Sequence, residues 1–138
     1  MPKYENQNDL TNEQAVAAFI GEKHGLVMEK LNPVYRLDYA GLRDGDVSSF
    51  FEIKCRTFKR DKYDTMMINA HKVASANYLL QSFGRQAFLV VRWTDFTGFI
   101  PFAGLEKWNM GIGGRFDRGD PKDRDICFYI PVSEFNEL

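Results

Sequence analysis

The dipeptide Asp44-Gly45 and the two runs that flank it constrain the fold of this chain more than any other feature. Residues 33–40 and 47–55 contain β-branched and aromatic side chains, which favour strands. Asp-Gly suits the two central positions of a tight hairpin turn, where the backbone takes positive φ angles. We therefore predict an antiparallel hairpin, with strands over 33–40 and 47–55.

The register of this hairpin decides which side chains meet on one face of the sheet. If the dipeptide alone forms the loop and pairing is regular, Asp38 lies opposite Phe51. If Asp46 joins the loop with a bulge, Asp38 lies opposite Glu52. A slip of one residue moves a side chain to the other face. We expect the second register, or an equivalent bulge, because it brings Asp38 beside Glu52 and Lys54.

Helix and strand patterns continue on both sides of the hairpin. Thr11 and Gln14 fit a capping box, apolar side chains then recur at helical spacing, and Gly25 is a stop, so we expect a helix over 11–25. The remaining expected elements are a helix over 67–83, strands over 86–93 and 97–102, a charged glycine-rich loop over 109–125 and a strand over 126–131. The order α-β-β-α-β-β-loop-β predicts an α+β fold with helices packed on a mixed sheet.

Length and charge narrow the class of protein. The chain has 138 residues, of which 44% are hydrophobic and 27% charged, so we expect one soluble domain over 1–138 with its core in residues 11–103. The formal net charge is −1. This value excludes a protein that binds nucleic acid simply as a polycation, but it leaves room for a local basic strip.

Cysteine usage and hydropathy indicate the compartment. Two cysteines, Cys55 and Cys127, are too few for a disulfide scaffold and suit a reducing environment. The longest apolar run, 15–20, is far short of the ~20 residues of a membrane span. The first eight residues lack the apolar segment of a secretory signal. We expect a cytoplasmic protein without a membrane partner.

Asp38, Glu52 and Lys54 form the candidate site. Side chains alternate along a strand, so Glu52 and Lys54 project from one face. Two carboxylates ~5 Å apart repel by about 3 kcal/mol at an effective dielectric near 20, a cost that a divalent cation reverses. Oxygen ligands favour Mg²⁺ or Mn²⁺, and a lysine beside the ion can hold a phosphate oxygen or orient a water. The alternative is a surface ion pair between Glu52 and Lys54, worth ~0–1 kcal/mol.

Glu13 can join these groups. It lies in the first turn of the expected helix, and Val16 and Ile20 follow it at i+3 and i+7, which places its carboxylate on the inward side. An acidic residue there also favours the helix dipole without any further role. Metal, carboxylates and a lysine together make a set of groups suited to phosphodiester hydrolysis.

With these residues the chain resembles the PD-(D/E)XK nuclease superfamily. The sequence around them looks like that of its small phage-type members. The resemblance rests on the early helix with Glu13, the hairpin with Asp38 in Leu-Asp-Tyr, and Glu52-Ile-Lys54, and it covers roughly 11–93. It implies a restriction-endonuclease-like fold. It also implies that Asp38, Glu52 and the Ile53 carbonyl bind the metal, that Glu13 contributes through a metal-bound water, and that Lys54 positions the attacking water.

Basic residues follow the candidate site. Residues 54–62 carry five of them, and beyond Lys54 these are Arg56, Lys59, Arg60 and Lys62, which could contact DNA phosphates or form an ordinary solvated loop. Lys72 on the second helix could reach the scissile phosphate, or its stem could extend from the packed side to solvent. Arg115 and Arg118 lie in the expected loop and could face the DNA backbone.

The leading hypothesis is a Mg²⁺- or Mn²⁺-dependent nuclease acting on DNA, and specifically an endonuclease of phage DNA replication, recombination or repair in the host cytoplasm. A homodimer would supply two sites for cutting two strands. One alternative is a non-catalytic nucleic-acid-binding module on a nuclease-like fold. A glycosidase built on two carboxylates fits less well, because it gives Lys54 no role.

Overall fold

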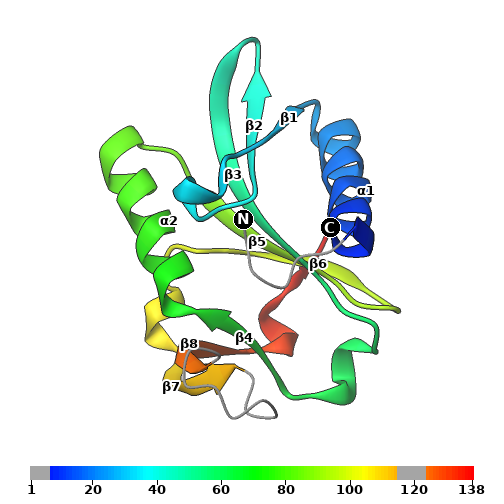
Figure 1. Ribbon diagram of the computed structural model, residues 1–138, viewed down its shortest axis with the longest axis vertical. Coiled ribbons are helices and arrows are strands. Elements are labelled where there is room, and N and C mark those ends of the chain that lie inside the picture. The colour runs from blue at the N-terminus through cyan, green and yellow to red at the C-terminus, as the bar shows by residue number, and fades with distance from the viewer. Residues whose placement is uncertain (1–6, 115–123) are drawn as a thin grey trace.

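The computed structural model describes residues 7–114 and 124–138. There, two helices and a smaller sheet surround a six-stranded sheet (Figure 1). The helices are α1 (Gln7–His24) and α2 (Ala70–Phe83). The strands are β1 (Val27–Lys30), β2 (Tyr39–Arg43), β3 (Asp46–Cys55), β4 (Thr65–Asn69), β5 (Ala87–Arg92), β6 (Thr97–Pro101), β7 (Asn109–Gly114), β8 (Arg124–Pro131) and β9 (Asn136–Glu137). No described helix is both long and apolar enough to cross a membrane.

The larger sheet is mixed, as predicted. Its strand order is β1-β2-β3-β5-β6-β9, and β3 pairs with β5 in parallel while the other neighbours are antiparallel. The connection from β3 to β5 passes through β4 and α2. The smaller sheet has the order β4-β8-β7. Strand β3 therefore lies inside the larger sheet and is hydrogen-bonded along both edges.

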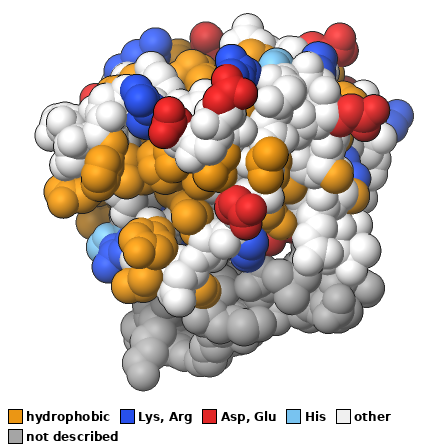
Figure 2. All heavy atoms as spheres, turned by 90° about the horizontal axis from the view of Figure 1, so that it is seen from above, with side chains coloured by type: hydrophobic (Ala, Val, Ile, Leu, Met, Phe, Trp, Pro, Cys, Tyr) orange, Lys and Arg blue, Asp and Glu red, His pale blue; other side chains and the backbone are white. Residues whose placement is uncertain are grey.

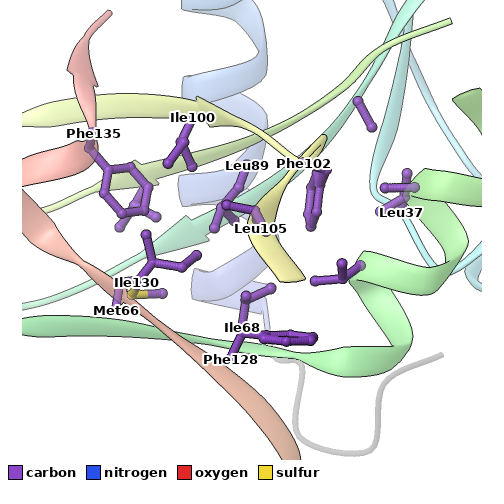
Figure 3. Packing of buried hydrophobic residues seen from close by; sticks show 14 of the residues in the cluster. Leu37, Met66, Ile68, Leu89, Ile100, Phe102, Leu105, Phe128, Ile130 and Phe135 are labelled. Carbon is purple, nitrogen blue, oxygen red and sulfur yellow. The ribbon is translucent and has the colours of Figure 1, made fainter. Parts of the chain in front are cut away.

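Hydrophobic side chains fill both faces of the larger sheet. On one face, Val16, Ala17 and Ile20 of α1 pack against Phe51 and Ile53 of β3. On the other face, a larger core joins the sheet to α2 and to the smaller sheet. Figure 3 shows this core from close by, and its labelled members are Leu37, Met66, Ile68, Leu89, Ile100, Phe102, Leu105, Phe128, Ile130 and Phe135. From Phe50 onward, the even-numbered positions of β3 face this second core, against which Phe50 packs.

The turn between β2 and β3 is a two-residue loop. Asp44 and Gly45 have φ angles of 54° and 84°, the left-handed values that such a turn needs. Arg43 pairs directly with Asp46. The three-residue loop that we expected, with Asp46 in the turn, is therefore wrong, because Asp46 already belongs to the strand.

A bulge next to the loop nevertheless gives the register that we expected. The pairing shifts by one residue, with Ser48 as the extra residue on β3, and Tyr39 then lies opposite Phe51. Continued by one residue, this register carries Asp38 towards Glu52. The two-residue loop alone would have placed Asp38 opposite Phe51, so the bulge, rather than the turn, sets the site.

The second helix begins three residues later than predicted. Residues 67–69 belong to β4, in which Met66 and Ile68 are buried and alternate with more exposed neighbours. Helix α2 starts after Asn69, whose side chain accepts a hydrogen bond of 2.7 Å from the His71 N–H. Pairing of β4 with β8 outweighs the apolar spacing that suggested a continuous helix.

Further segments differ from the prediction. Helix α1 begins at Gln7, so Thr11 lies inside it and does not cap it. Strand β1 occupies 27–30, where no element was expected. Residues 33–35 form a 3₁₀ turn capped by Asn32, so the strand predicted over 33–40 begins only at Tyr39. Residues 109–114 and 124–125, assigned to the loop, belong to the paired strands β7 and β8. Pairing partners from distant parts of the chain stabilise these short strands, which local sequence does not reveal.

Candidate active site

Asp38 is held in place by strand β3. It lies just before β2, and its backbone N–H donates to the Phe51 carbonyl at 3.0 Å. Its Oδ2 accepts a hydrogen bond of 2.7 Å from the backbone N–H of Ile53. Its own carbonyl accepts one of 2.8 Å from the Leu31 N–H. These bonds orient the carboxylate beside the segment that carries Glu52 and Lys54.

Glu52 is a buried carboxylate between two lysines. It is 1% exposed, with Oε2 at 3.3 Å from Lys54 Nζ and Oε1 at 3.4 Å from Lys72 Nζ. Oε1 is fully buried and accepts no hydrogen bond from the described residues. Burial raises the pKa of Glu52 to about 7, and Asp38 adds to the rise while both lysines oppose it. A buried, ionised Glu52 carboxylate would therefore be stabilised by a further cation bound beside it.

Glu13 reaches the site from the first half of α1. Its side chain is buried, and Oε2 lies 2.6 Å from Lys30 Nζ. Burial raises the pKa of Glu13 to about 7, the hydrogen bond from Lys30 lowers it, and the charge of Asp38 raises it. The sequence placed this carboxylate on the inward side of the helix, and the structure agrees.

Lys30 is a residue of the site that sequence reasoning missed. It is the last residue of β1, and its Nζ lies 3.7 Å from Asp38 Oδ1 in addition to its contact with Glu13. Its Nζ also lies 5.3 Å from the centre of the Tyr39 ring. The only available signal was the run of three apolar residues, 26–28, before Glu29-Lys30, which is too brief to predict a strand.

The structure thus brings together all four predicted catalytic residues around Asp38. Glu13 comes from the helix that packs on the Phe51 and Ile53 face of β3, while Glu52 and Lys54 project from the opposite face. The Asp38 carboxylate raises the pKa of both glutamates, so it lies close to each of them. The three carboxylates therefore belong to one cluster.

The residues present fit a single oxygen-ligated divalent cation. Asp38 and Glu52 offer carboxylate oxygens, and the buried Glu52 Oε1 lacks a hydrogen-bond donor. Carboxylate oxygens are the ligands that Mg²⁺ or Mn²⁺ prefers. Within residues 7–114 and 124–138, no group of three or more His, Cys, Asp and Glu side chains is arranged to hold a metal ion. Glu13 is instead engaged by Lys30.

Lys72 is the predicted DNA-contacting residue that lies within the site. Besides its contact with Glu52, its Nζ donates a hydrogen bond to the Arg36 carbonyl. It also lines a surface pocket of about 570 Å³, together with Arg36, His71 and Asn69. This pocket adjoins the N-terminus of α2 and carries basic side chains, so it suits a phosphate group.

The basic residues after β3 differ in their surroundings. Lys59 and Lys62 are exposed, and the Lys62 ammonium lies 5.1 Å from the centre of the Phe58 ring. The Arg60 guanidinium lies over the Phe96 ring, 4.0 Å from its centre. Arg56 is half-buried, donates to the Cys55 carbonyl at 3.2 Å, and has its pKa lowered by burial. The face of the molecule seen from above, in Figure 2, carries basic and acidic side chains interspersed beside a hydrophobic band. Arg115 and Arg118 lie outside the described residues.

Comparisons with known proteins identify the family and the fold of this chain. The whole chain, residues 1–138, matches the model of a family described as "Phage putative PDDEXK endonuclease". A search of curated proteins found no match. The fold is similar to that of Hjc, a Holliday junction resolvase from Archaeoglobus fulgidus, with 14% identity, 93% of this chain and 90% of that chain covered, and a TM-score of 0.60. It is also similar to D212, a nuclease from a fusellovirus, with 14% identity, 94% and 83% covered, and a TM-score of 0.52. The predicted superfamily and its fold are thereby confirmed.

Proposed function

The chain belongs to the phage PDDEXK endonuclease family, and from this premise we propose that it is a divalent-metal-dependent endonuclease that hydrolyses DNA phosphodiester bonds. One observation carries the proposal. Asp38 and the buried, hydrogen-bond-deficient Glu52 lie at the same point of the sheet, and Lys54 contacts Glu52 at 3.3 Å. A buried carboxylate beside the half-buried Asp38 and an adjacent ammonium has little structural value unless a cation and an anionic substrate complete it.

Each residue has a distinct task in this proposal. Asp38, Glu52 and the Ile53 carbonyl would hold Mg²⁺ or Mn²⁺, which when bound supplies a polarised water and offsets charge on the phosphate. Lys54, whose side chain is one-third exposed, reaches solvent beside Glu52 and positions the attacking water. Its ammonium also offsets the charge that develops on the phosphate oxygens.

Basic groups near the site would hold the DNA backbone. Lys72 contacts Glu52 and also lines the pocket with Arg36 and His71, so one phosphate next to the scissile bond can lie there. Lys59 and Lys62 are exposed after the catalytic strand and would contact phosphates further along the DNA. Arg56 and Arg60 contribute less in this proposal, because both side chains are half-buried.

A cleavage panel tests the proposal. Purified protein is incubated with duplex, nicked, single-stranded and four-way DNA, with RNA as a further substrate, in Mg²⁺ or Mn²⁺ and in excess chelator, with Asp38→Asn as the blank. We expect metal-dependent internal cleavage of at least one DNA and none by the blank. DNA that is bound in gel shifts but never cut would overturn the proposal and support a non-catalytic binding module.

We further propose that the chain acts as one domain over 1–138 and as a homodimer in the host cytoplasm, in DNA replication, recombination or repair. Two copies related by symmetry would supply one site for each strand of a duplex. Sedimentation with and without DNA measures the assembly. A monomer that introduces paired cuts at the same rate per site would contradict the dimer.

A further inference from the structure

Resting on the proposed function, we propose that the Lys30 ammonium takes the place of a second metal ion, so that this active site holds one divalent cation. The three acidic side chains would otherwise offer two neighbouring positions for cations. One lies between Asp38 and Glu52, and the other between Asp38 and Glu13. The structure treats these two positions differently.

The position between Glu13 and Asp38 is already filled by a positive charge. Lys30 Nζ lies 2.6 Å from Glu13 Oε2 and 3.7 Å from Asp38 Oδ1, so one ammonium bridges the two carboxylates. The Tyr39 ring lies on the same ammonium at 5.3 Å, which further favours a cation at this point. A protonated lysine has no lone pair to offer a metal. It therefore competes with an ion for these oxygens and cannot help to bind one.

The position between Asp38 and Glu52 has the opposite character. Two lysines contact the Glu52 carboxylate, but at longer distances. Lys54 Nζ lies 3.3 Å from Oε2, and Lys72 Nζ lies 3.4 Å from Oε1. Oε1 stays buried without a hydrogen-bond donor among the described residues. A carboxylate in this state gains more from a metal ion than Glu13, which already has a short contact with an ammonium.

Charge also opposes occupation of both positions by metal. The two positions share Asp38, so an ion bound there lies within a few ångströms of the Lys30 ammonium. A second divalent ion would have to expel the ammonium from both of its partners and would bind beside the first ion. Replacement of Lys30 by a neutral side chain of similar length removes this competitor and leaves both carboxylates available.

Manganese alone is a direct probe of this inference. Mn²⁺ is titrated into the full-length, metal-free protein in the absence of DNA, with calorimetry to count ions and electron paramagnetic resonance to detect spin coupling between paired ions. The wild type is expected to bind one ion and give a mononuclear spectrum. Lys30→Met is expected to bind two ions and give a coupled spectrum. Lys23→Met, which alters an exposed lysine at the far end of α1, should match the wild type.

Two further variants make the result specific. Lys30→Arg keeps the positive charge and should bind one ion. Lys30→Met combined with Glu13→Gln should return to one ion, because the second position loses a ligand. Thermal unfolding verifies that each variant is folded. If Lys30→Met is not folded, the wild-type count and Lys30→Gln still decide the question.

The outcomes separate this inference from the proposed function. Two coupled ions in the wild type, or one ion in a folded Lys30→Met protein, would overturn the role of Lys30 while leaving a metal-dependent nuclease intact. A wild type that binds no Mn²⁺ at millimolar concentration would overturn the metal dependence itself, and this inference with it. One ion in the wild type and two in Lys30→Met would support the inference.

Discussion

The backbone N–H of Ile53 donates a hydrogen bond to Oδ2 of Asp38 at 2.7 Å. Ile53 is the middle residue of Glu-Ile-Lys, so the strand that supplies Glu52 and Lys54 also orients the carboxylate from the neighbouring strand. The side chain of Ile53 packs against α1 on the opposite face. One residue therefore links the hydrophobic core to the geometry of the acidic pair.

This hydrogen bond predicts different effects for two substitutions of Asp38. In Asp38→Asn the amide oxygen can still accept from Ile53, so the free energy of unfolding should stay within about 1 kcal/mol of the wild type. In Asp38→Ala the Ile53 N–H loses its partner, which should cost about 1–3 kcal/mol. Urea denaturation of the metal-free proteins measures both values, and Mn²⁺ titration should show lost binding in both. Equal destabilisation by the two variants would contradict this account.

Glu52→Gln should stabilise the metal-free protein at alkaline pH. The pKa of Glu52 is about 7 in the folded protein against an ordinary 4.5, so the folded state binds the proton more tightly than the unfolded chain. Stability is then lost as pH rises from about 4.5 through about 7, by about 3 kcal/mol for a shift of this size. We expect Glu52→Gln to be about 2–3 kcal/mol more stable than wild type at pH 8 and similar to it at pH 5.

Denaturation at several pH values in the presence of chelator tests this expectation. Exposed Glu106→Gln is the matched control and should follow the wild type at every pH. Addition of Mg²⁺ should stabilise the wild type at pH 8 but not Glu52→Gln, because only the wild type keeps both carboxylates. An advantage of Glu52→Gln that is the same at pH 5 and pH 8 would mean that burial of the charge is not its cause.

Lys54→Ala should separate catalysis from binding. Loss of an ammonium that stabilises developing charge lowers the rate of cleavage by roughly 10²–10³-fold or more. DNA affinity should fall by less than about tenfold, because one exposed contact with a phosphate contributes only about 1 kcal/mol to binding. Single-turnover cleavage and fluorescence anisotropy give the two numbers. Full cleavage by Lys54→Ala would rule out the role assigned to this lysine.

Lys59 and Lys62 should affect how DNA affinity depends on salt. Each phosphate contact contributes about 0.9 to the slope of log affinity against log salt. We therefore expect Lys59→Gln and Lys62→Gln each to lower the slope by roughly that amount, and Lys23→Gln to leave it unchanged. Anisotropy titrations from low to moderate salt, with Ca²⁺ in place of Mg²⁺ to limit cleavage, provide the slopes. An unaltered slope in both variants would mean that Lys59 and Lys62 do not contact DNA phosphates.

The shared face of Glu52 and Lys54 could be predicted from sequence because its determinant is local. Side chains alternate along β3, and this signal lies within one short stretch of chain. The bulge at Ser48 could not be located, since nothing in the sequence around Ser48 distinguishes a bulge there from a longer turn. Only the requirement that Asp38 meet Glu52 favoured a shifted register.

Lys30 could not be predicted, because its place in the site depends on pairing between distant residues. It belongs to a four-residue edge strand whose side chains are mostly exposed, so neither alternation nor hydrophobic length identifies that strand. The start of α2 was misjudged for a related reason. Ile68 lies at helical spacing from Ala76 and Leu79, but residues 67–69 pair with Tyr129, Phe128 and Cys127 of β8.

Lys30 and Glu52 belong to strands of the larger sheet that differ in their number of hydrogen-bonded neighbours. Strand β1 is an outermost strand with one neighbour, whereas β3 is bonded to β2 and β5. Brief opening of β1 would therefore move the Lys30 ammonium away from the site while the Glu52 carboxylate stays in place. Deuterium uptake should be faster along 27–30 than along 50–55. Transient opening of β1 would then set the rate at which a second metal ion enters the position between Glu13 and Asp38.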